Sequence, residues 1–192
     1  MTDSSEETDI SIMGLIRKGD AKAFELLIAR HQRAVYNLAL RFLNDSDEAE
    51  DVAQDVFIRI YKAAATYTPD AKFTTWLYTI VRNLCFNVLR SRRQAVIVSV
   101  DDEALPELPA QNEDPVKRIT RQQLRKKVIH AVGRLPENMR LAVILSKYHG
   151  LSYDEVAGIM GCSVNAIKLR VHRAKALLAE ELSEFKGETN DY

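Results

Sequence analysis

Four side chains near the end of the chain, Asn165, Lys168, His172 and Arg173, recur at a spacing that places them on one face of a helix. The opposite face of that helix is apolar and contains Ile167. A helix with basic and amide groups on its free face can enter the major groove of duplex DNA and contact phosphates and base edges. The pattern favours a DNA-reading helix. The competing interpretation is a solvated basic face on an ordinary bundle helix.

The residues before this helix predict a tight turn between two helices. Ser152 and Glu155 have the spacing of a capping box, which opens a helix with two reciprocal hydrogen bonds. Gly161 stands where the chain must turn, and glycine tolerates the left-handed conformation needed there. Ser163 is available to cap the next helix. The stretch over residues 150–178 is therefore predicted to be a helix-turn-helix.

Charges are arranged in blocks along a chain that is neutral as a whole, with 27 basic and 27 acidic residues. Residues 61–98 carry 6 basic and 1 acidic side chains, and residues 116–179 carry 13 and 3. Between them, residues 99–115 carry 6 acidic side chains and no basic one. Neutrality is thus an average over surfaces of opposite sign, which we expect to have different functions.

An acidic stripe is predicted on the helix over residues 44–67. Glu48, Asp51 and Asp55 share one face of this helix, and its other side is apolar. Such a stripe is either a solvated surface or a contact for a basic protein partner, and the spacing alone leaves both interpretations open.

The predicted helix over residues 73–94 carries a second set of candidate contacts. An apolar stripe that includes Leu77 and Val81 faces the core, and arginine, asparagine and aromatic side chains lie on the other side. Rings stack on unpaired bases and guanidinium groups follow phosphates, so this composition suits single-stranded nucleic acid. Burial in the core is the competing interpretation for Phe73 and Trp76. The candidates on and just before this helix are Tyr67, Phe73, Trp76, Arg82, Asn83, Phe86 and Arg90.

Helical periodicity over most of the chain predicts an all-α protein. The periodicity is lost where acidic residues and prolines gather, so we expect two small helical bundles joined by a flexible acidic linker. The polar N-terminus does not resemble a signal peptide, and no apolar run approaches the ~20 residues of a membrane helix. We therefore expect a cytoplasmic protein without membrane insertion. The expected segments are a disordered N-terminus (1–9), a first bundle (10–95), the linker (96–115), a second bundle (116–183) and an acidic tail (184–192).

Histidine and cysteine residues are the remaining candidates for chemistry. His31, His130, His149 and Cys162 would be the groups of an enzyme, but they are scattered without the spacing of a catalytic or metal-ligand set. Cys85 and Cys162 lack the spacing of a redox pair, and we expect two buried thiols in a reducing cytoplasm. The sequence predicts no enzyme activity, no metal site and no cofactor.

Three motifs, in this order, carry a resemblance to a known family. They are "AEDVAQDVFIRIY" (49–61), "FTTWLYTIVRN" with the following "LRSRR" (73–93), and the stretch over 134–178 that holds the helix-turn-helix. Together they resemble an extracytoplasmic-function (group IV) sigma factor of bacterial RNA polymerase, in the sigma-70 family. The resemblance implies that the first bundle is sigma region 2 and the second is sigma region 4.

The resemblance also implies roles for single residues. The acidic stripe would grip the clamp helices of the polymerase, the aromatic and amide groups would hold a flipped base, and the basic helix would read the minus-35 element. Asn87 and Leu169 depart from the residues common at their positions, which bears on the promoter sequence. The implied contacts are Asp51, Gln54 and Asp55 with core polymerase, Tyr67, Trp76 and Asn83 with the minus-ten base, and Lys168, His172 and Arg173 with the minus-35 element.

The function implied is a sigma factor that directs core polymerase to specific promoters and helps to open the DNA, in a stress or envelope response. Its partners would be core polymerase, promoter DNA and an anti-sigma factor. The alternative is a free-standing helix-turn-helix regulator that binds duplex DNA without polymerase. Co-purification with core polymerase distinguishes the two.

Overall fold

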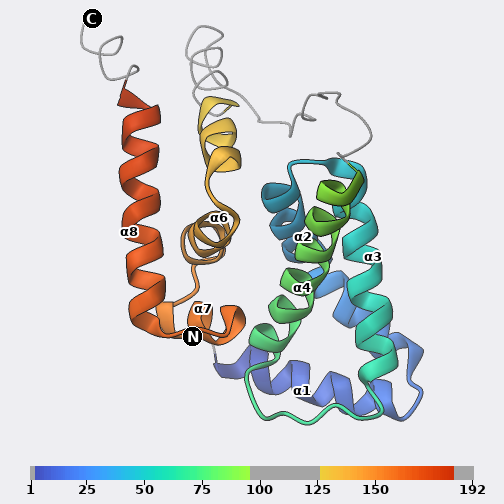
Figure 1. Cartoon of the computed structure of the whole chain (residues 1–192). Coiled ribbons are helices and arrows are strands. Elements are labelled where there is room, and N and C mark those ends of the chain that lie inside the picture. Colours follow the sequence, from blue (N-terminus) through green and yellow to red (C-terminus); the bar gives the residue numbers. More distant parts are fainter. Residues whose placement is uncertain (1–2, 96–125, 184–192) are drawn as a thin grey trace, which may run out of the picture.

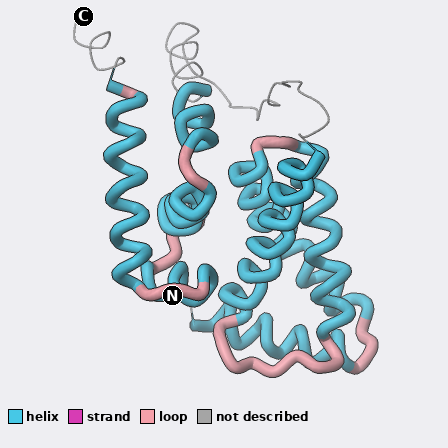
Figure 2. Tube along the Cα trace, in the orientation of Figure 1, coloured by secondary structure: helices cyan, strands magenta, loops and turns pink. Residues whose placement is uncertain are grey.

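The computed structural model describes residues 3–95 and 126–183, and every regular element in those ranges is helical (Figures 1 and 2). This confirms the all-α class. The expected linker over 96–115 and tail over 184–192 lie outside the described residues. The N-terminal bundle consists of α1 (Asp3–Arg17), α2 (Ala21–Leu43), α3 (Ser46–Ala63) and α4 (Phe73–Ala95). The C-terminal bundle consists of a helix over 126–134, α6 (Glu137–Val143), the π-helix η1 (Ile144–Tyr148), α7 (Tyr153–Met160) and α8 (Val164–Glu181).

The first helix begins earlier than the sequence predicts. It starts at Asp3, so the expectation of a disordered N-terminus over residues 1–9 is wrong from residue 3 onward. Its apolar side packs into the core of the bundle. Asp9 is only 2% exposed, and its carboxylate pairs with the guanidinium of Arg30 and with His31 on α2. These partners are 21 and 22 residues away, so no local pattern indicates the contact.

Side-chain caps fix where α2 and α3 begin. Asp20 and Asp45 each accept a hydrogen bond from the backbone N–H three residues later, which satisfies a donor that the helix leaves free. Between these helices, Asn44 adopts a left-handed φ of 60° and ends α2. α2, α3 and α4 pack with their apolar stripes inward. The centre of the bundle contains Leu27, Val35, Leu38, Phe42, Val56, Ile60, Leu77 and Val81, all fully buried.

The predicted helix-turn-helix is present in the C-terminal bundle. The backbone N–H of Ser152 donates to the Glu155 carboxylate at 2.9 Å, and the N–H of Glu155 donates to Ser152 Oγ at 3.3 Å, which completes the capping box. Gly161 has the left-handed φ of 62° that ends α7, and Ser163 caps α8. The side chains that α8 buries are Ile167, Val171 and Ala174.

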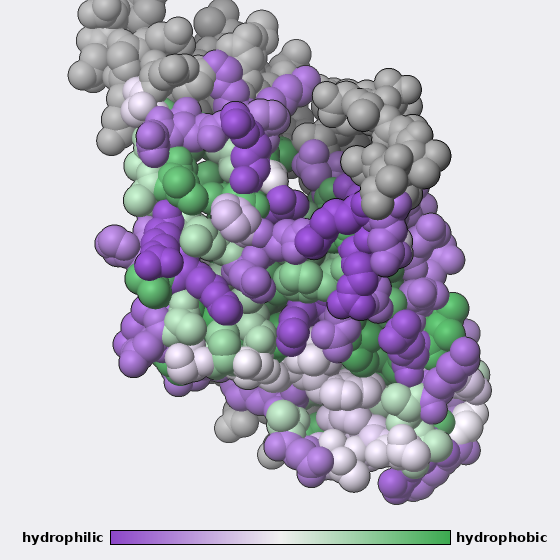
Figure 3. All heavy atoms as spheres, in the orientation of Figure 1, coloured by the Kyte–Doolittle hydropathy of each residue, from purple (hydrophilic) through white to green (hydrophobic). Residues whose placement is uncertain are grey.

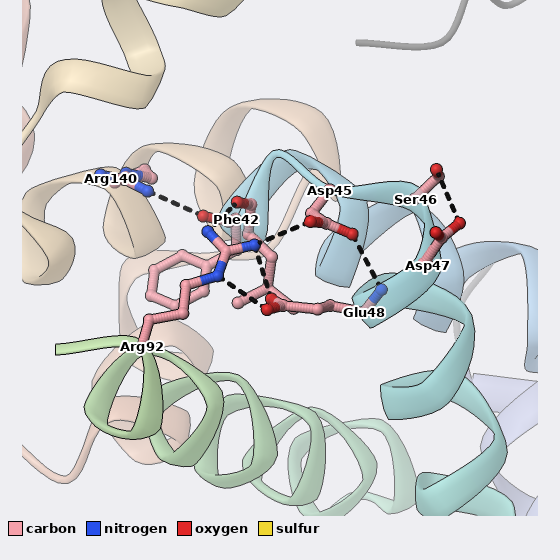
Figure 4. Close-up of polar contacts among 8 residues, drawn as sticks. Phe42, Asp45, Ser46, Asp47, Glu48, Arg92 and Arg140 are labelled. Atoms are coloured by element: carbon pink, nitrogen blue, oxygen red, sulfur yellow. Dashed lines mark hydrogen bonds and ion pairs between the residues drawn. The ribbon is translucent and has the colours of Figure 1, made fainter. Parts of the chain in front are cut away.

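The two bundles pack directly on each other, a relationship that the sequence did not predict. α4 lies against α7, and α2 lies against α6 and η1 (Figure 1). Buried apolar residues of both bundles belong to one continuous cluster. At the polar edge of this contact, Arg140 of α6 donates a hydrogen bond of 2.8 Å to the carbonyl oxygen of Phe42 (Figure 4).

Arg92 fastens the end of α4 to the connection between α2 and α3. Its guanidinium lies between Asp45 and Glu48 (Figure 4), with Nη2 at 3.2 Å from Asp45 Oδ2 and 2.6 Å from Glu48 Oε2. Nη1 donates to the carbonyl oxygen of Leu43 at 3.2 Å. Arg92, although basic, therefore forms its contacts within the N-terminal bundle.

Hydrophilic side chains and smaller hydrophobic patches alternate over the visible face of both bundles (Figure 3). Among the described residues, no helix combines the length and the apolar character needed to cross a membrane. The large apolar side chains that are exposed in this part of the chain are Leu15, Leu26, Ile58, Tyr61, Tyr148, Leu169 and Leu177.

Candidate nucleic-acid interface

The four candidates of the basic helix lie together on one exposed face of α8. Asn165, Lys168, His172 and Arg173 are all exposed, while Ile167, on the opposite side, is fully buried. Because the packing face and the free face are separate, this helix can approach a ligand without disturbing the core. The structure brings the set together as predicted.

Glu155 connects the helix-turn-helix with the start of α4. Besides its bonds to Ser152, the carboxylate accepts a hydrogen bond of 3.1 Å from Lys72 Nζ. The hydrogen bond from the Ser152 backbone, assisted by the Ser152 and Lys72 side chains, holds the pKa of Glu155 below its ordinary value, although partial burial opposes this. The ionised carboxylate thus serves both the helix cap and the contact between the bundles.

The candidates for polymerase contact lie on the outer side of α3. Asp51, Gln54 and Asp55 are all exposed. The two carboxylates also line an open groove of about 570 Å³ whose other wall is α4. Glu48, the third member of the predicted stripe, pairs with Arg92 instead. Arg59 and Arg92 line the same groove, but three carboxylates outnumber them, so this acidic groove keeps a small excess of negative charge that attracts basic side chains.

Three aromatic rings gather at the start of α4. The ring centroids of Tyr67 and Trp76 are 4.8 Å apart, and the Phe73 centroid lies 5.8 Å from Trp76 and 6.3 Å from Tyr67. Phe73 is fully buried, whereas Tyr67 and Trp76 are half-buried. The core interpretation is therefore right for Phe73, and the other two rings retain partial access to solvent.

The polar candidates on α4 divide between two environments. Asn83 and Arg90 are exposed. Arg82 is half-buried, and its Nη1 donates a hydrogen bond of 2.8 Å to the carbonyl oxygen of Ile159 in α7. The structure therefore does not bring Arg82 onto the same free surface as Asn83.

Phe86 is a correction to the sequence prediction, which placed it as an exposed ring among arginines. It is half-buried and packs on the buried ring of Phe42, with centroids 5.3 Å apart. The guanidinium of Arg82 lies 6.0 Å from the Phe86 ring centroid. The prediction fails because this side of α4 faces α2 and the C-terminal bundle, neither of which helical periodicity can locate.

Two further contacts join the bundles across the same interface. Arg93 Nη2 donates to both carboxylate oxygens of Glu137, at 2.6 and 2.8 Å. The rings of Tyr78 and His149 meet edge to face with centroids 5.3 Å apart. Burial raises the pKa of Tyr78, and burial together with the charge of Arg41 lowers the pKa of His149 to about 4. Both rings are therefore uncharged at neutral pH.

Asp9 and His31 form a pair that sequence reasoning missed. His31 Nε2 lies 2.9 Å from the Asp9 carboxylate, and the His31 ring is 5.3 Å from the centroid of Phe73. The pair thus connects α1 with the aromatic rings at the start of α4. One signal was available, because His31 stands in register with Leu27 and Val35 on the apolar face of its helix.

The histidines and cysteines do not assemble into a catalytic set in the described part of the chain. His31 and His149 belong to different bundles, and Cys162 Sγ accepts a hydrogen bond of 3.1 Å from Arg170. Cys85 is buried as predicted, whereas Cys162 is only half-buried. Burial raises the pKa of Cys85 to about 12, so this thiol stays protonated. Within the described residues, no three His, Cys, Asp or Glu side chains are placed to hold a metal ion.

Comparison with known proteins identifies both bundles. The family model of sigma-70 region 2 matches residues 27–95, and that of sigma-70 region 4 matches residues 125–178. The chain is also 33% identical over 188 residues to the RNA polymerase sigma-H factor of Pseudomonas aeruginosa, covering 93% of this chain and 95% of the relative. The chain belongs to the sigma-70 family.

The type of sigma factor follows from a second relative. The ECF RNA polymerase sigma-E factor of Escherichia coli K12 is 35% identical over 178 residues, which cover 90% of this chain and 93% of that protein. The protein is thus an RNA polymerase sigma factor of the extracytoplasmic-function type. The free-standing regulator is not favoured, because the match to region 2 accounts for the N-terminal bundle.

Two solved structures share the fold. CnrH in complex with the cytosolic domain of CnrY has a TM-score of 0.69 and 26% identity, covering 92% of this chain and 98% of that chain. RpoE from Bartonella quintana, in complex with the anti-sigma factor NepR, has a TM-score of 0.70 and 28% identity, covering 85% and 98%.

Proposed function

We propose that this sigma factor binds core polymerase through α3, captures unpaired bases of the minus-ten element at the start of α4, and reads the minus-35 duplex with α8. The observation that carries the proposal is the separation of three surfaces with different chemistry. The outer side of α3 is acidic, the first half of α4 is aromatic with an exposed amide at Asn83, and the free face of α8 is basic. One molecule can therefore hold the polymerase and both promoter elements at once.

Capture of the opening strand needs stacking and hydrogen bonding but no bond-making group. A base that leaves the duplex stacks on the half-buried rings of Tyr67 and Trp76, and the exposed amide of Asn83 can bond to its edge. Stacking contributes about 1–3 kcal/mol per base, comparable with the cost of unstacking. Arg90 is placed to follow the phosphates. The polymerase carries out the chemistry, so the sigma factor is not an enzyme, and it acts in the cytoplasm with the polymerase.

Separation of the bundles is part of this mechanism. Arg82 is bound to the Ile159 carbonyl in the arrangement described, so it reaches the minus-ten strand only when α7 moves away from α4. We infer that core polymerase holds the bundles apart, because region 2 and region 4 then contact promoter elements at different places on the DNA.

Solved relatives suggest a protein inhibitor. RpoE of Bartonella quintana was solved with an anti-sigma factor, and CnrH with the cytosolic domain of CnrY. We expect this sigma factor to bind an anti-sigma factor as well. The extracytoplasmic-function class of its relatives supports a role in a stress or envelope response.

The proposal is tested with purified protein, core polymerase and a promoter library randomised at both elements. We expect transcription from a defined promoter only when both proteins are present. Arg173→Ala should cost about 1–3 kcal/mol of binding to the upstream element, since its planar guanidinium can bond to two acceptors. Arg33→Ala is the control, because Arg33 is an exposed arginine on α2, outside the helix-turn-helix. Nanomolar specific binding to duplex DNA without polymerase would contradict the proposal.

A further inference from the structure

Leu169 is an apolar side chain at the centre of the basic face of α8. It is 49% exposed. At 3.6 residues per turn, Asn165, His172 and Arg173 lie within about 60° of it around the helix axis, and the buried Ile167 lies about 160° away. Leu169 therefore points in nearly the opposite direction to the packing face. The surface that the proposed function directs at DNA has an apolar centre and a polar rim.

The chemistry of the major groove offers one partner for such a centre. An exposed leucine gains free energy only when another apolar group removes it from water. Hydrogen-bonding groups fill the floor of the major groove, and the apolar group exposed there is the C5-methyl of thymine. We propose that Leu169 determines promoter specificity by contacting the C5-methyl group of a thymine in the minus-35 element. This inference rests on the proposed function of α8.

A second exposed leucine on the same helix provides a matched control. Leu177 is 43% exposed, close to the value for Leu169. It lies about 12 Å further along the helix axis. There it lines a groove with Arg134 and Glu181, between α8 and the helix over 126–134. Loss of Leu177 should therefore leave base discrimination unchanged.

The test uses sigma factor bound to core polymerase and promoter DNA in which single thymines are replaced by deoxyuridine, which removes only the methyl group. The wild-type holoenzyme first selects its upstream element from a randomised library, and binding is then compared at one salt concentration. For at least one thymine we expect about fourfold weaker binding of the uracil form, which corresponds to ~0.8 kcal/mol for one buried methyl. Leu169→Ser should abolish this difference, whereas Leu177→Ser and Lys168→Ala should keep it.

Each of the following outcomes would overturn the inference. If wild type binds the thymine and uracil forms of the promoter equally at every position, Leu169 does not contact a methyl group. The same conclusion follows if Leu169→Ser keeps the wild-type ratio of the two affinities. In either case α8 can still be the helix that reads the minus-35 element. If Leu169→Ser lowers affinity for core polymerase and leaves the ratio intact, the leucine contacts protein. If scrambling the whole upstream element has no effect on wild type, the proposed function of α8 itself fails. Circular dichroism verifies that each variant is folded.

Discussion

Arg82 of α4 and Ile159 of α7 are joined by a hydrogen bond of 2.8 Å from Nη1 to the carbonyl oxygen, which ties the helix proposed to capture the minus-ten strand to the helix-turn-helix. Lys72, just before α4, pairs in the same way with Glu155 of α7. In both contacts an acceptor of the C-terminal bundle binds a cationic side chain that lies on or just before α4. Promoter DNA and the C-terminal bundle are therefore expected to compete for α4.

Gly158 allows this competition to be tested without removing either partner. A Cβ added at Gly158 would lie 3.5 Å from Thr75 Cγ2 on α4, which is an ordinary contact. Gly158→Ala should therefore keep the bundles together, whereas Gly158→Trp should force them apart. Both substitutions raise helix propensity, so α7 itself should not be weakened. We expect the tryptophan variant to have a larger radius of gyration by X-ray scattering and to bind single-stranded DNA several-fold more tightly. Equal radii and affinities for the two variants would show that the contact does not restrict α4.

Charge reversal on α3 should weaken binding to the polymerase. Asp51→Arg and Asp55→Arg each replace an exposed carboxylate in the acidic groove, so we expect about tenfold weaker core binding for each, or ~1.4 kcal/mol. Stability should change by no more than about 0.5 kcal/mol, because both side chains are exposed. Glu25→Arg, which makes the same charge change on an exposed position of α2, is the control in a quantitative pull-down. Equal weakening by all three variants would indicate a general charge effect.

Asn83→Ala should impair promoter opening more than recruitment. The amide is exposed about two turns beyond Trp76 on the same side of α4, where it can meet a base that has left the duplex but not a paired base. We expect slower opening, followed by permanganate reactivity of unpaired thymines, and rescue on a pre-melted template. Gln32→Ala, an exposed amide on α2, should behave as wild type. Failure of the pre-melted template to rescue Asn83→Ala at all would remove this residue from the capture step.

The buried pair of Asp9 and His31 should contribute substantially to stability. Removing a buried carboxylate from its partners leaves their polar groups poorly compensated, so we expect Asp9→Ala to lower the free energy of unfolding by about 2–4 kcal/mol. Asp20→Ala, which removes only the helix cap of α2, should cost about 1 kcal/mol. Urea denaturation of the two variants measures the difference. A cost for Asp9→Ala no larger than that for Asp20→Ala would mean that the pair does not hold α1 in place.

Features set by neighbouring residues were predictable from the sequence. The capping box of Ser152 and Glu155, the left-handed turn at Gly161 and the exposed face of α8 all depend on spacings within one or two helical turns. Such spacings fix backbone hydrogen bonds and helix faces directly. The all-α class and the grouping of the α8 candidates therefore agree with the prediction from spacing, and the two sigma regions agree with what the family resemblance implied.

Features set by packing between distant segments were not predictable in this way. Arg82 and Ile159 are 77 residues apart, and nothing local to either residue indicates that they meet. Phe86 has the spacing of an outer-face residue, yet it packs on Phe42 because α2 lies beside it. Periodicity gives the direction of a side chain around its own helix, but it does not say which other helix lies there.

Because His149 is buried beside Tyr78, we expect acid to lower the free energy of unfolding. Burial and the charge of Arg41 lower the pKa of His149 to about 4, whereas an unfolded histidine has a pKa near ~6.5. The unfolded chain therefore binds this proton more readily, and the free energy of unfolding rises with pH between about 4 and 6.5. The stabilisation is fully present above about pH 6.5, falls as the pH drops through the window, and amounts to roughly 3 kcal/mol in all.

His149→Phe isolates this effect, because it keeps an aromatic ring against Tyr78 and removes the titrating group. Urea denaturation of both proteins between pH 5 and 7 is the measurement. We expect the stability of wild type to fall toward pH 5 and that of the variant to fall much less. The other three of the four histidines are common to both proteins, so their contributions cancel in the difference. Glu155, whose pKa is lowered by its bonds to Ser152 and Lys72, loses its charge only at more acidic pH and does not interfere in this range. If the free energy of unfolding depends on pH in the same way for both proteins, His149 does not gain a proton on unfolding. Its burial would then not make the contact between the bundles sensitive to acid.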